Sequence, residues 1–292
     1  MPLTPIALRC NDLVEPLAVA TAAPRLSWRL AGAPALQTAW QVQVADDAGF
    51  ARLRWDSGRQ TGDACAQIAY GGPALAPAAL AWWRVRAWDE AGQEGPWSAS
   101  TRWGAGLARP ADWQGARWIR APQPTPAVHL LRRDFASGAV RDARLYLTAR
   151  GIVTATLNGR PVGDEVFAPG WTDYRQRIHY RCHDVTALVR AGANCLAARL
   201  GEGWWCGPLA WDQRRLYGRH SELLCLLRLE GADGAVTWIA SDGEWRTADG
   251  GTRESSFLNG EHHDAGLEIA GWELPGFADA AWEAVRPLAE EG

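Results

Sequence analysis

A glycine-rich segment at residues 201–218 carries the densest group of side chains suited to chemistry. Aromatic rings stack on the apolar C–H patches of a sugar, while flanking carboxylate and guanidinium groups hydrogen-bond its hydroxyls. The Gly-x-Gly at its start does not predict a phosphate cradle, because two indoles stand where backbone amides would have to approach an anion. We interpret the segment as a sugar platform, or alternatively as a loop that plugs the end of a sandwich or docks a neighbouring module. Its candidate ligand-binding residues are Glu202, Trp204, Trp205, Trp211, Asp212 and Tyr217.

Two further polar and aromatic clusters stand on either side of this segment. In residues 167–177 a Pro-Gly pair predicts a turn that presents Trp171, Asp173 and Tyr174. We add Trp171 and Asp173 to the candidate ligand-binding residues; a purely structural corner is the alternative. Residues 255–266 bring together Glu261, two histidines and Asp264, which predict either an acid–base set or a solvated loop that contacts another domain.

Glycoside hydrolysis by this chain would need two carboxyl groups about 5 to 10 Å apart, one on either side of the scissile bond. The sequence does not fix such distances among its loop carboxylates. The motifs Gly-x-Ser-x-Gly and His-Glu-x-x-His and the Walker loop are all absent from the sequence. We therefore assign no catalytic residue, and keep hydrolysis open only as an alternative carried by Glu202, Asp212, Glu261 and Asp264.

Metal and cofactor sites are not expected from the residue spacing. The six cysteines are scattered with no Cys-x-x-Cys pair, which predicts free buried thiols. A zinc site could be assembled only from His179, Cys182, His183 and the pair His262–His263. Adjacent strand residues point to opposite faces, however, so neighbours in this set cannot both ligate easily.

Charge and composition narrow the classes of partner. The chain has 30 basic and 33 acidic residues, a net charge of -3 and no basic stripe, which argues against nucleic acid and anionic membranes. No stretch approaches the roughly 18 apolar residues of a membrane helix, and the first residues lack the pattern of a signal peptide, so we expect a cytoplasmic protein. The 18 Trp residues among 292 are unusually many, which favours sugar binding, although most should be packing residues.

Short alternating runs separated by Gly, Pro, Asn and Asp predict an all-β protein of two consecutive antiparallel sandwiches, at residues 1–106 and 107–292. In the first, residues 38–46 and 81–89 read as strands, the second with an exposed ladder of Arg and Trp side chains suited to cation–π stacking. The stretch WRVRAWDEAGQEGPWS (83–98) resembles a fibronectin type III domain, in the immunoglobulin-like class.

The second sandwich is predicted to contain strands at 140–151, 152–162, 177–184 and within 223–242. Asn158 and Gly159 supply the positive φ angles of a tight hairpin turn. One short helix is predicted at 184–192, with Asp184 as its N-cap and Gly192 just past its end.

Residues 145–207, 214–218 (RRLYG) and 259–266 (NGEHHDAG) together resemble the N-terminal region of bacterial α-L-rhamnosidases. The resemblance implies that the second sandwich is jelly-roll-like and related to galactose-binding domains. It also implies that hydrolysis belongs to a C-terminal (α/α)6 barrel in the same or a partner polypeptide. We expect this chain to lack that barrel, because the sequence shows no run of long amphipathic helices.

The function implied by the resemblance is a non-catalytic carbohydrate-recognition and scaffold portion of an α-L-rhamnosidase, with L-rhamnose-containing glycosides as ligands. Related sandwiches bind L-rhamnose with calcium, for which Asn158 and Asp164 lie near a suitable turn, but the residues do not otherwise support a calcium site. The alternative is a β-sandwich module that docks protein and binds no sugar.

Overall fold

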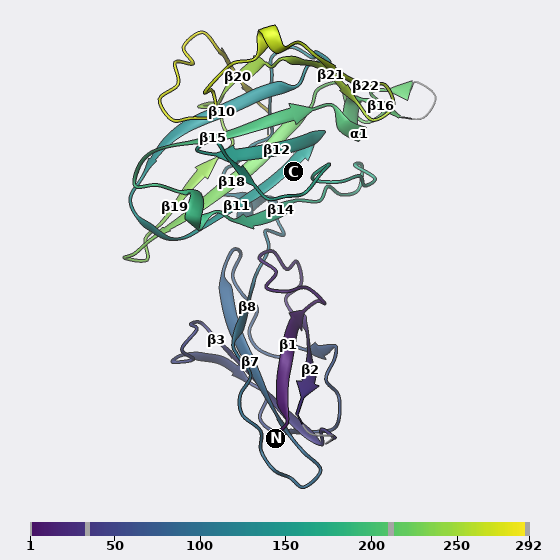
Figure 1. Cartoon of the computed structure of the whole chain (residues 1–292), viewed down its shortest axis with the longest axis vertical. Coiled ribbons are helices and arrows are strands. Elements are labelled where there is room, and N and C mark those ends of the chain that lie inside the picture. Colours follow the sequence, from purple (N-terminus) through teal and green to yellow (C-terminus); the bar gives the residue numbers. More distant parts are fainter. Residues whose placement is uncertain (1, 33–35, 210–212, 290–292) are drawn as a thin grey trace. The chain divides into compact units, whose positions relative to one another are not determined.

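The computed structural model describes residues 2–32, 36–209 and 213–289, which form two compact units, Met1–Asp112 and Trp113–Gly292 (Figure 1). Both units are built from antiparallel sheets, so the predicted all-β class is confirmed. The boundary expected after residue 106 lies shortly before this division. Among the described residues, no helix is long and apolar enough to cross a membrane.

Unit 1 contains two sheets whose inner faces enclose a core of Trp, Val and Leu side chains. The first has the order β1-β2-β6, with β1 (Thr4–Cys10), β2 (Arg25–Ala31) and β6 (Ile68–Ala69). The second has the order β4-β3-β7-β8, with β4 (Leu53–Asp56), β3 (Ala39–Ala45), β7 (Leu80–Trp88) and β8 (Thr101–Gly104), and β5 (Gln60–Thr61) also pairs with β3.

The predicted faces of β7 are confirmed. Trp83 and Val85 are fully buried in the core, while Arg84 and Arg86 lie on the opposite face. Both guanidinium groups lie 4.6 Å from the ring centre of Trp97, and Arg84 also lies 4.2 Å from that of Phe50. This cation–π ladder covers the outer face of the sheet.

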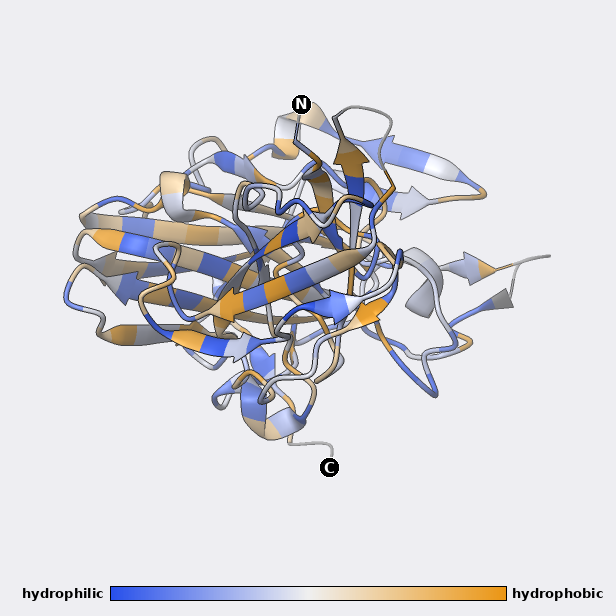
Figure 2. Ribbon diagram, turned by 90° about the horizontal axis from the view of Figure 1, so that it is seen from below, coloured by the Kyte–Doolittle hydropathy of each residue, from blue (hydrophilic) through white to orange (hydrophobic). Residues whose placement is uncertain are grey.

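Unit 2 is a sandwich of two six-stranded sheets, whose strands carry both apolar and polar residues (Figure 2). We call the sheet with the order β13-β12-β15-β10-β20-β23 the front sheet, and the other the back sheet. The front sheet contains β13 (Arg160–Val162), β12 (Ile152–Leu157), β15 (Gly192–Gly201), β10 (His129–Ser137), β20 (Arg246–Asp249) and β23 (Glu283–Ala284). The back sheet contains β14 (Arg181–Asp184), β11 (Val140–Arg150), β18 (Glu222–Gly231), β9 (Ile119–Arg120), β24 (Arg286–Pro287) and β19 (Val236–Ala240), the last paired with β18.

The hairpin between β12 and β13 turns at Asn158 and Gly159, whose φ angles of 56° and 74° confirm the predicted turn. The Asn158 amide nitrogen donates to the Leu188 carbonyl and to Asn194 Oδ1, and its oxygen accepts from the Cys195 backbone N–H. Asn158 therefore ties the turn to β15.

The helix predicted at 184–192 is wrong. Only one 3₁₀ turn forms, η2 (Thr186–Leu188), and residue 192 already begins β15. Valines on both sides of the turn disfavour a longer helix, and the Asp184 carboxylate accepts from the backbone and side chain of Thr186, which closes a local turn instead. The strand predicted at 177–184 is also shorter, since β14 begins at residue 181.

The segment after residue 264 returns along the outer face of the front sheet. Arg132 of β10, which is fully buried, donates to the Trp272 carbonyl at 2.9 Å and pairs with Asp134 and Asp279. Trp272 packs against Leu130, also on the outer face. This anchoring holds the C-terminal segment beside the strands that line the site described next.

Candidate functional site

The predicted platform begins where β15 ends. The chain turns through α1 (Gly203–Cys206), a single helical turn, and then forms a short hairpin of β16 (Pro208–Leu209) and β17 (Gln213–Arg214). Because successive helical residues are rotated by about 100°, the adjacent indoles of Trp204 and Trp205 leave the turn in different directions. Two other candidates of the segment 201–218, Trp211 and Asp212, lie outside the described residues.

Trp204 belongs to a partly exposed group of four rings, which we call the aromatic cluster: Phe167, Trp171, Trp204 and Phe257. Trp204 stacks on Phe257 with ring centres 4.2 Å apart, and on Trp171 at 6.3 Å with nearly parallel planes. Phe167 stands edge-on to Trp204 and Phe257. Trp171 is 56% exposed and Phe167 55%, so the cluster presents apolar surface to solvent.

Trp205 points inward. Its ring contacts Tyr174 edge-on at 5.3 Å and stacks on Tyr217 at 6.1 Å, while the Arg150 guanidinium lies 5.1 Å from the ring centre. The indole N–H is buried and makes no hydrogen bond among the described residues. Tyr174 is itself buried, so the prediction that the turn presents it is wrong, and burial raises the pKa of its hydroxyl to about 12. Trp205 and Tyr217 therefore act as packing residues that support the loop.

The two predicted carboxylates in the described part of the site are both engaged within the protein. Glu202 is buried and forms an ion pair with Arg214; burial raises the pKa of its carboxyl group, and the guanidinium opposes that shift. Asp173 accepts hydrogen bonds from Arg175 and Gln176, and the pairing with Arg175 lowers the pKa of its carboxyl group. Both residues stabilise loops rather than face a cavity.

A cavity of about 390 Å³ lies beside the aromatic cluster, on the outer face of the front sheet. We call it the aromatic cavity. Phe167 and Phe257 line it, whereas Trp204 stands behind Phe257. In Figure 1, α1 and the hairpin of β21 (Thr252–Ser256) and β22 (Gly260–His263) lie at the same end of unit 2. The polar side chains in its wall are Thr154, Arg199, Thr252, Ser255, Ser256 and Glu261.

Arg199 is the basic group of the aromatic cavity. It lies on β15 opposite Thr154 of β12, with its side chain on the outer face. Its guanidinium donates to Glu273 at 2.6 Å and lies 5.1 Å from the ring centre of Trp272. The C-terminal segment thus fixes the position of the Arg199 guanidinium. Because a guanidinium carries five N–H donors, Arg199 can also donate to oxygen atoms in the cavity.

The sequence predicts Glu261 only as an acid–base candidate, and it does not predict a role for Phe167, Arg199 or Phe257. Both phenylalanines lie in the polar and aromatic clusters of residues 167–177 and 255–266, and their position in these clusters is a signal for the site. Arg199 lies in a regular strand and carried no such signal.

Two residues of the segment 255–266, predicted as a possible acid–base set, make local contacts in the structure. His263 contacts Thr252 at 3.1 Å and Glu268 at 3.4 Å, and the Asp264 carboxylate accepts from the Gly266 backbone N–H. Within the described ranges, no three His, Cys, Asp or Glu side chains form a group that could hold a metal ion. The histidines and Cys182 of the zinc alternative are therefore not assembled into a site.

Comparison with known proteins identifies the family. The model of the alpha-L-rhamnosidase N-terminal domain matches residues 138–291, and that of the Rha78A-like, N-terminal immunoglobulin domain matches residues 5–109. An α-L-rhamnosidase of Streptomyces avermitilis is 45% identical over 178 residues, which cover 60% of this chain and 17% of the relative. Another, from Formosa agariphila, is 32% identical and covers 93% of this chain and 31% of the relative. The chain thus spans a third or less of the length of these relatives.

Solved structures agree with the family models. The Streptomyces avermitilis α-L-rhamnosidase complexed with L-rhamnose matches 98% of this chain and 45% of its own, with a TM-score of 0.92 and 27% identity. The Aspergillus terreus α-L-rhamnosidase matches 99% of this chain and 34% of its own, with a TM-score of 0.90 and 30% identity. The resemblance inferred from the sequence is confirmed: this chain belongs to the α-L-rhamnosidase N-terminal domain family, with an immunoglobulin-like domain before it.

Proposed function

We propose that this chain is the sugar-recognising and scaffolding portion of an α-L-rhamnosidase, and that its aromatic cavity binds L-rhamnose units of glycosides. The observation that carries the proposal is the placement of Phe167 and Phe257 beside Arg199 and Glu261 in one cavity. Cleavage of the glycosidic bond would belong to a separate catalytic barrel, since we assign no catalytic residue here.

The size of the aromatic cavity suits one or two sugar units. Sites for small ligands typically enclose about 300 to 1,000 Å³, with apolar walls and a few placed polar groups. A deoxyhexose such as L-rhamnose offers a methyl group and ring C–H bonds to the two phenylalanines. Its hydroxyls would accept from Arg199 and donate to Glu261, which lie in the same wall.

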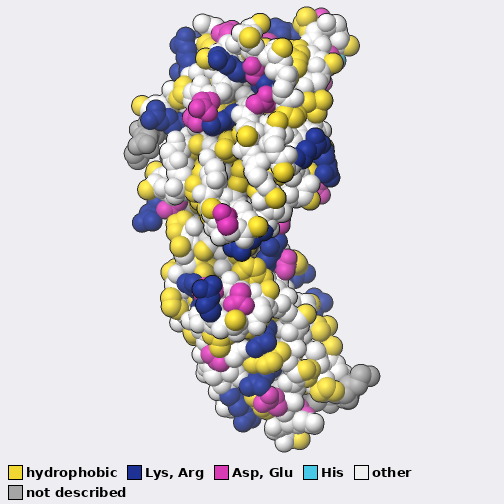
Figure 3. Space-filling view, turned by 90° about the vertical axis from the view of Figure 1, so that its left-hand side faces the viewer, with side chains coloured by type: hydrophobic (Ala, Val, Ile, Leu, Met, Phe, Trp, Pro, Cys, Tyr) yellow, Lys and Arg dark blue, Asp and Glu magenta, His cyan; other side chains and the backbone are white. Residues whose placement is uncertain are grey.

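A second candidate function, protein docking, is favoured by one specific feature. Val166 is 81% exposed and Leu258 59%, and both adjoin members of the aromatic cluster in sequence. Exposed apolar groups of this kind mark interaction surfaces. Elsewhere, on the face in Figure 3, acidic and basic side chains are interspersed. A docking surface would use the exposed rim of the cluster and leave the polar wall of the cavity without a role.

Calorimetric titration with L-rhamnose tests the proposal. Phe257→Ala should weaken binding at least about tenfold, because it removes one ring wall and the surface on which Trp204 stacks. The matched control is Phe50→Ala in unit 1, whose ring packs on Arg84 far along the chain from the cavity, and which should leave the affinity unchanged. Absence of L-rhamnose binding to the folded wild-type chain would instead favour docking.

A further inference from the structure

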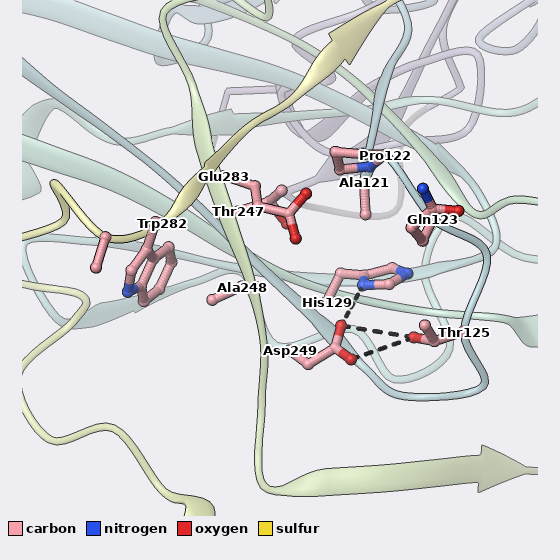
Figure 4. A pocket seen from close by; sticks show the side chains of 11 residues that line it. Ala121, Pro122, Gln123, Thr125, His129, Thr247, Ala248, Asp249, Trp282 and Glu283 are labelled. Atoms are coloured by element: carbon pink, nitrogen blue, oxygen red, sulfur yellow. Dashed lines mark hydrogen bonds and ion pairs between the residues drawn. The ribbon is translucent and has the colours of Figure 1, made fainter.

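A second cavity, of about 280 Å³, lies at the edge of the unit 2 sandwich (Figure 4). It opens where β23 leaves the front sheet: Glu283 pairs with Thr247, but the next residues of β20, Ala248 and Asp249, have no partner in β23. The segment that follows β9, in the back sheet, forms another wall. The lining residues include Gln123, Thr125, His129, Thr247, Asp249, Trp282 and Glu283. We call it the edge cavity.

A buried imidazole and a carboxylate form the centre of this cavity. His129 Nδ1 lies 2.9 Å from Asp249 Oδ1, and the imidazole is almost fully buried. Thr125 and Arg253 also donate to the Asp249 carboxylate, at 3.4 to 3.5 Å. The hydrogen bond from His129 is the main cause that lowers the pKa of Asp249, so this carboxylate is ionised at neutral pH.

The pairing with Asp249 sets the orientation of the His129 ring. An ionised carboxylate only accepts hydrogen bonds, so Nδ1 of His129 carries a proton and donates it to Asp249. Nε2 has no partner among the described residues. The edge cavity therefore contains a buried imidazole held in one orientation, and the second nitrogen of its ring can form a further hydrogen bond.

Other polar groups around the edge cavity are also without partners in the described part of the chain. The hydroxyl of Thr247 is buried and makes no hydrogen bond. Such a buried group costs stability unless a ligand or water completes it. The exposed carboxylate of Glu283 forms no ion pair within the same ranges, and Figure 4 shows it near Thr247, with Trp282 on one side of the cavity and His129 below.

We infer that the edge cavity binds an uncharged monosaccharide unit. Hydroxyl groups both donate and accept, so they match Nε2 of His129, the carboxylate of Glu283 and the hydroxyl of Thr247, while Trp282 offers an apolar surface to the sugar ring. An anion would meet two carboxylates. A cation would meet one uncompensated carboxylate, that of Glu283, since the charge of Asp249 is already compensated by Arg253 and by the His129 hydrogen bond.

This inference goes beyond the proposed function and is independent of it. The edge cavity and the aromatic cavity share no lining residue. His129 and Asp249 are cross-strand partners whose side chains lie on the inner face of the front sheet, whereas Arg199 of the aromatic cavity lies on the outer face. Each site can therefore fail without the other.

The test follows the imidazole ¹⁵N resonances of the full chain during titration with L-rhamnose, D-mannose and D-galactose. The resonance of His129 Nε2, assigned by its loss in His129→Gln, should shift with at least one of these neutral sugars. D-glucuronate and D-glucosamine, the anionic and cationic probes, should cause no shift at equal concentration. A shift with the charged probes alone, or with none of the five, overturns the inference.

The variant Thr247→Val separates ligand contact from folding. It removes the unpartnered hydroxyl at nearly constant side-chain shape, so it should raise Tm. It should also weaken, by about tenfold, the affinity for the sugar that shifts the His129 resonance. Thr154→Val is the matched control from the aromatic cavity and should leave the His129 titration unchanged. If Thr247→Val leaves that titration unchanged as well, the assigned site is wrong. If Phe257→Ala loses L-rhamnose binding in calorimetry but keeps the sugar-induced shift of the His129 resonance, the result bears on the aromatic cavity and leaves the inference about the edge cavity standing.

Discussion

Trp204 and Trp205 are neighbours in the chain, but they have opposite roles. Trp204 supports the exposed aromatic cluster, whereas Trp205 is enclosed by Tyr174, Tyr217 and Arg150. The difference arises from the single helical turn that carries both. Sugar recognition and loop stability are therefore separable at the level of single side chains.

This separation predicts contrasting effects of alanine substitutions. Trp205→Ala should lower the free energy of unfolding by about 3 kcal/mol, because it leaves a cavity among packed rings. Trp204→Ala should cost about 1 kcal/mol or less and should mainly weaken L-rhamnose binding, since Phe257 loses its support. Urea unfolding and calorimetry measure the two quantities. Equal losses of stability in both variants would contradict these assignments.

Asp249 provides a prediction of pH dependence. Its pKa is lowered in the folded chain, so the stabilisation from its ionised form is present above the unfolded-state pKa and is lost as pH falls through the folded pKa. Wild-type stability should therefore fall as pH drops below about 4. Asp249→Asn should be less stable at pH 7 and should show a shallower fall in that window.

The control for this prediction is Asp63→Asn in unit 1, at an exposed position. Its profile of unfolding free energy against pH should follow that of the wild type. A profile of Asp249→Asn that is parallel to the wild type below pH 4 would show that the pairing with His129 does not stabilise the fold.

Among the elements, the hairpin at Asn158–Gly159 has a backbone requirement that a single substitution can test. Gly159 has a φ of 74°, and a Cβ atom there would lie 2.9 Å from Leu274 Cδ2. Gly159→Ala should therefore destabilise the chain by about 1 to 2 kcal/mol, through backbone strain and the close approach. Thermal or urea unfolding measures the effect.

Gly138→Ala is the matched control for the hairpin. Gly138 lies outside the positive-φ region, and an added Cβ would meet no atom within 4 Å. This substitution should be neutral or slightly stabilising, because it restricts the unfolded chain. If both alanine variants lose the same stability, the turn geometry is not the cause.

The strands could be predicted because one face of each sheet is buried, which imposes alternation on sequences such as 38–46 and 81–89. The helix expected at 184–192 shows the limit of such reasoning. Its pattern satisfied the signals for helix start and end, but the pairing of β14 with β11 and of β15 with β10 left room for only one 3₁₀ turn. Tertiary pairing outweighed local propensity there.

At the scale of the molecule, the two cavities could not be predicted because their walls come from distant parts of the chain. The aromatic cavity combines residue 128 with residue 261, and the edge cavity combines residue 121 with residue 283. The sequence marked Trp171 and Trp204 by composition, and the structure does place them in one cluster. It could not show that Phe257 and Arg199 would face the cavity beside them.

The division into two units predicts that sugar binding belongs to unit 2 alone. A chain of residues 113–292 should fold and bind L-rhamnose within about twofold of the full chain, because both cavities are lined only by residues after 113. Circular dichroism and calorimetry would show this. A folded unit 2 that has lost its affinity would place part of the sugar site in unit 1.

The most direct test of the central claim is saturation-transfer NMR of the full chain with L-rhamnose, using D-mannose as the comparison sugar and an aryl α-L-rhamnoside added afterwards. The account predicts selective transfer to L-rhamnose, a marked loss of that transfer in Phe257→Ala, and no release of the aryl group. Transfer to neither sugar would contradict sugar recognition by the aromatic cavity, and release of the aryl group would contradict a non-catalytic role.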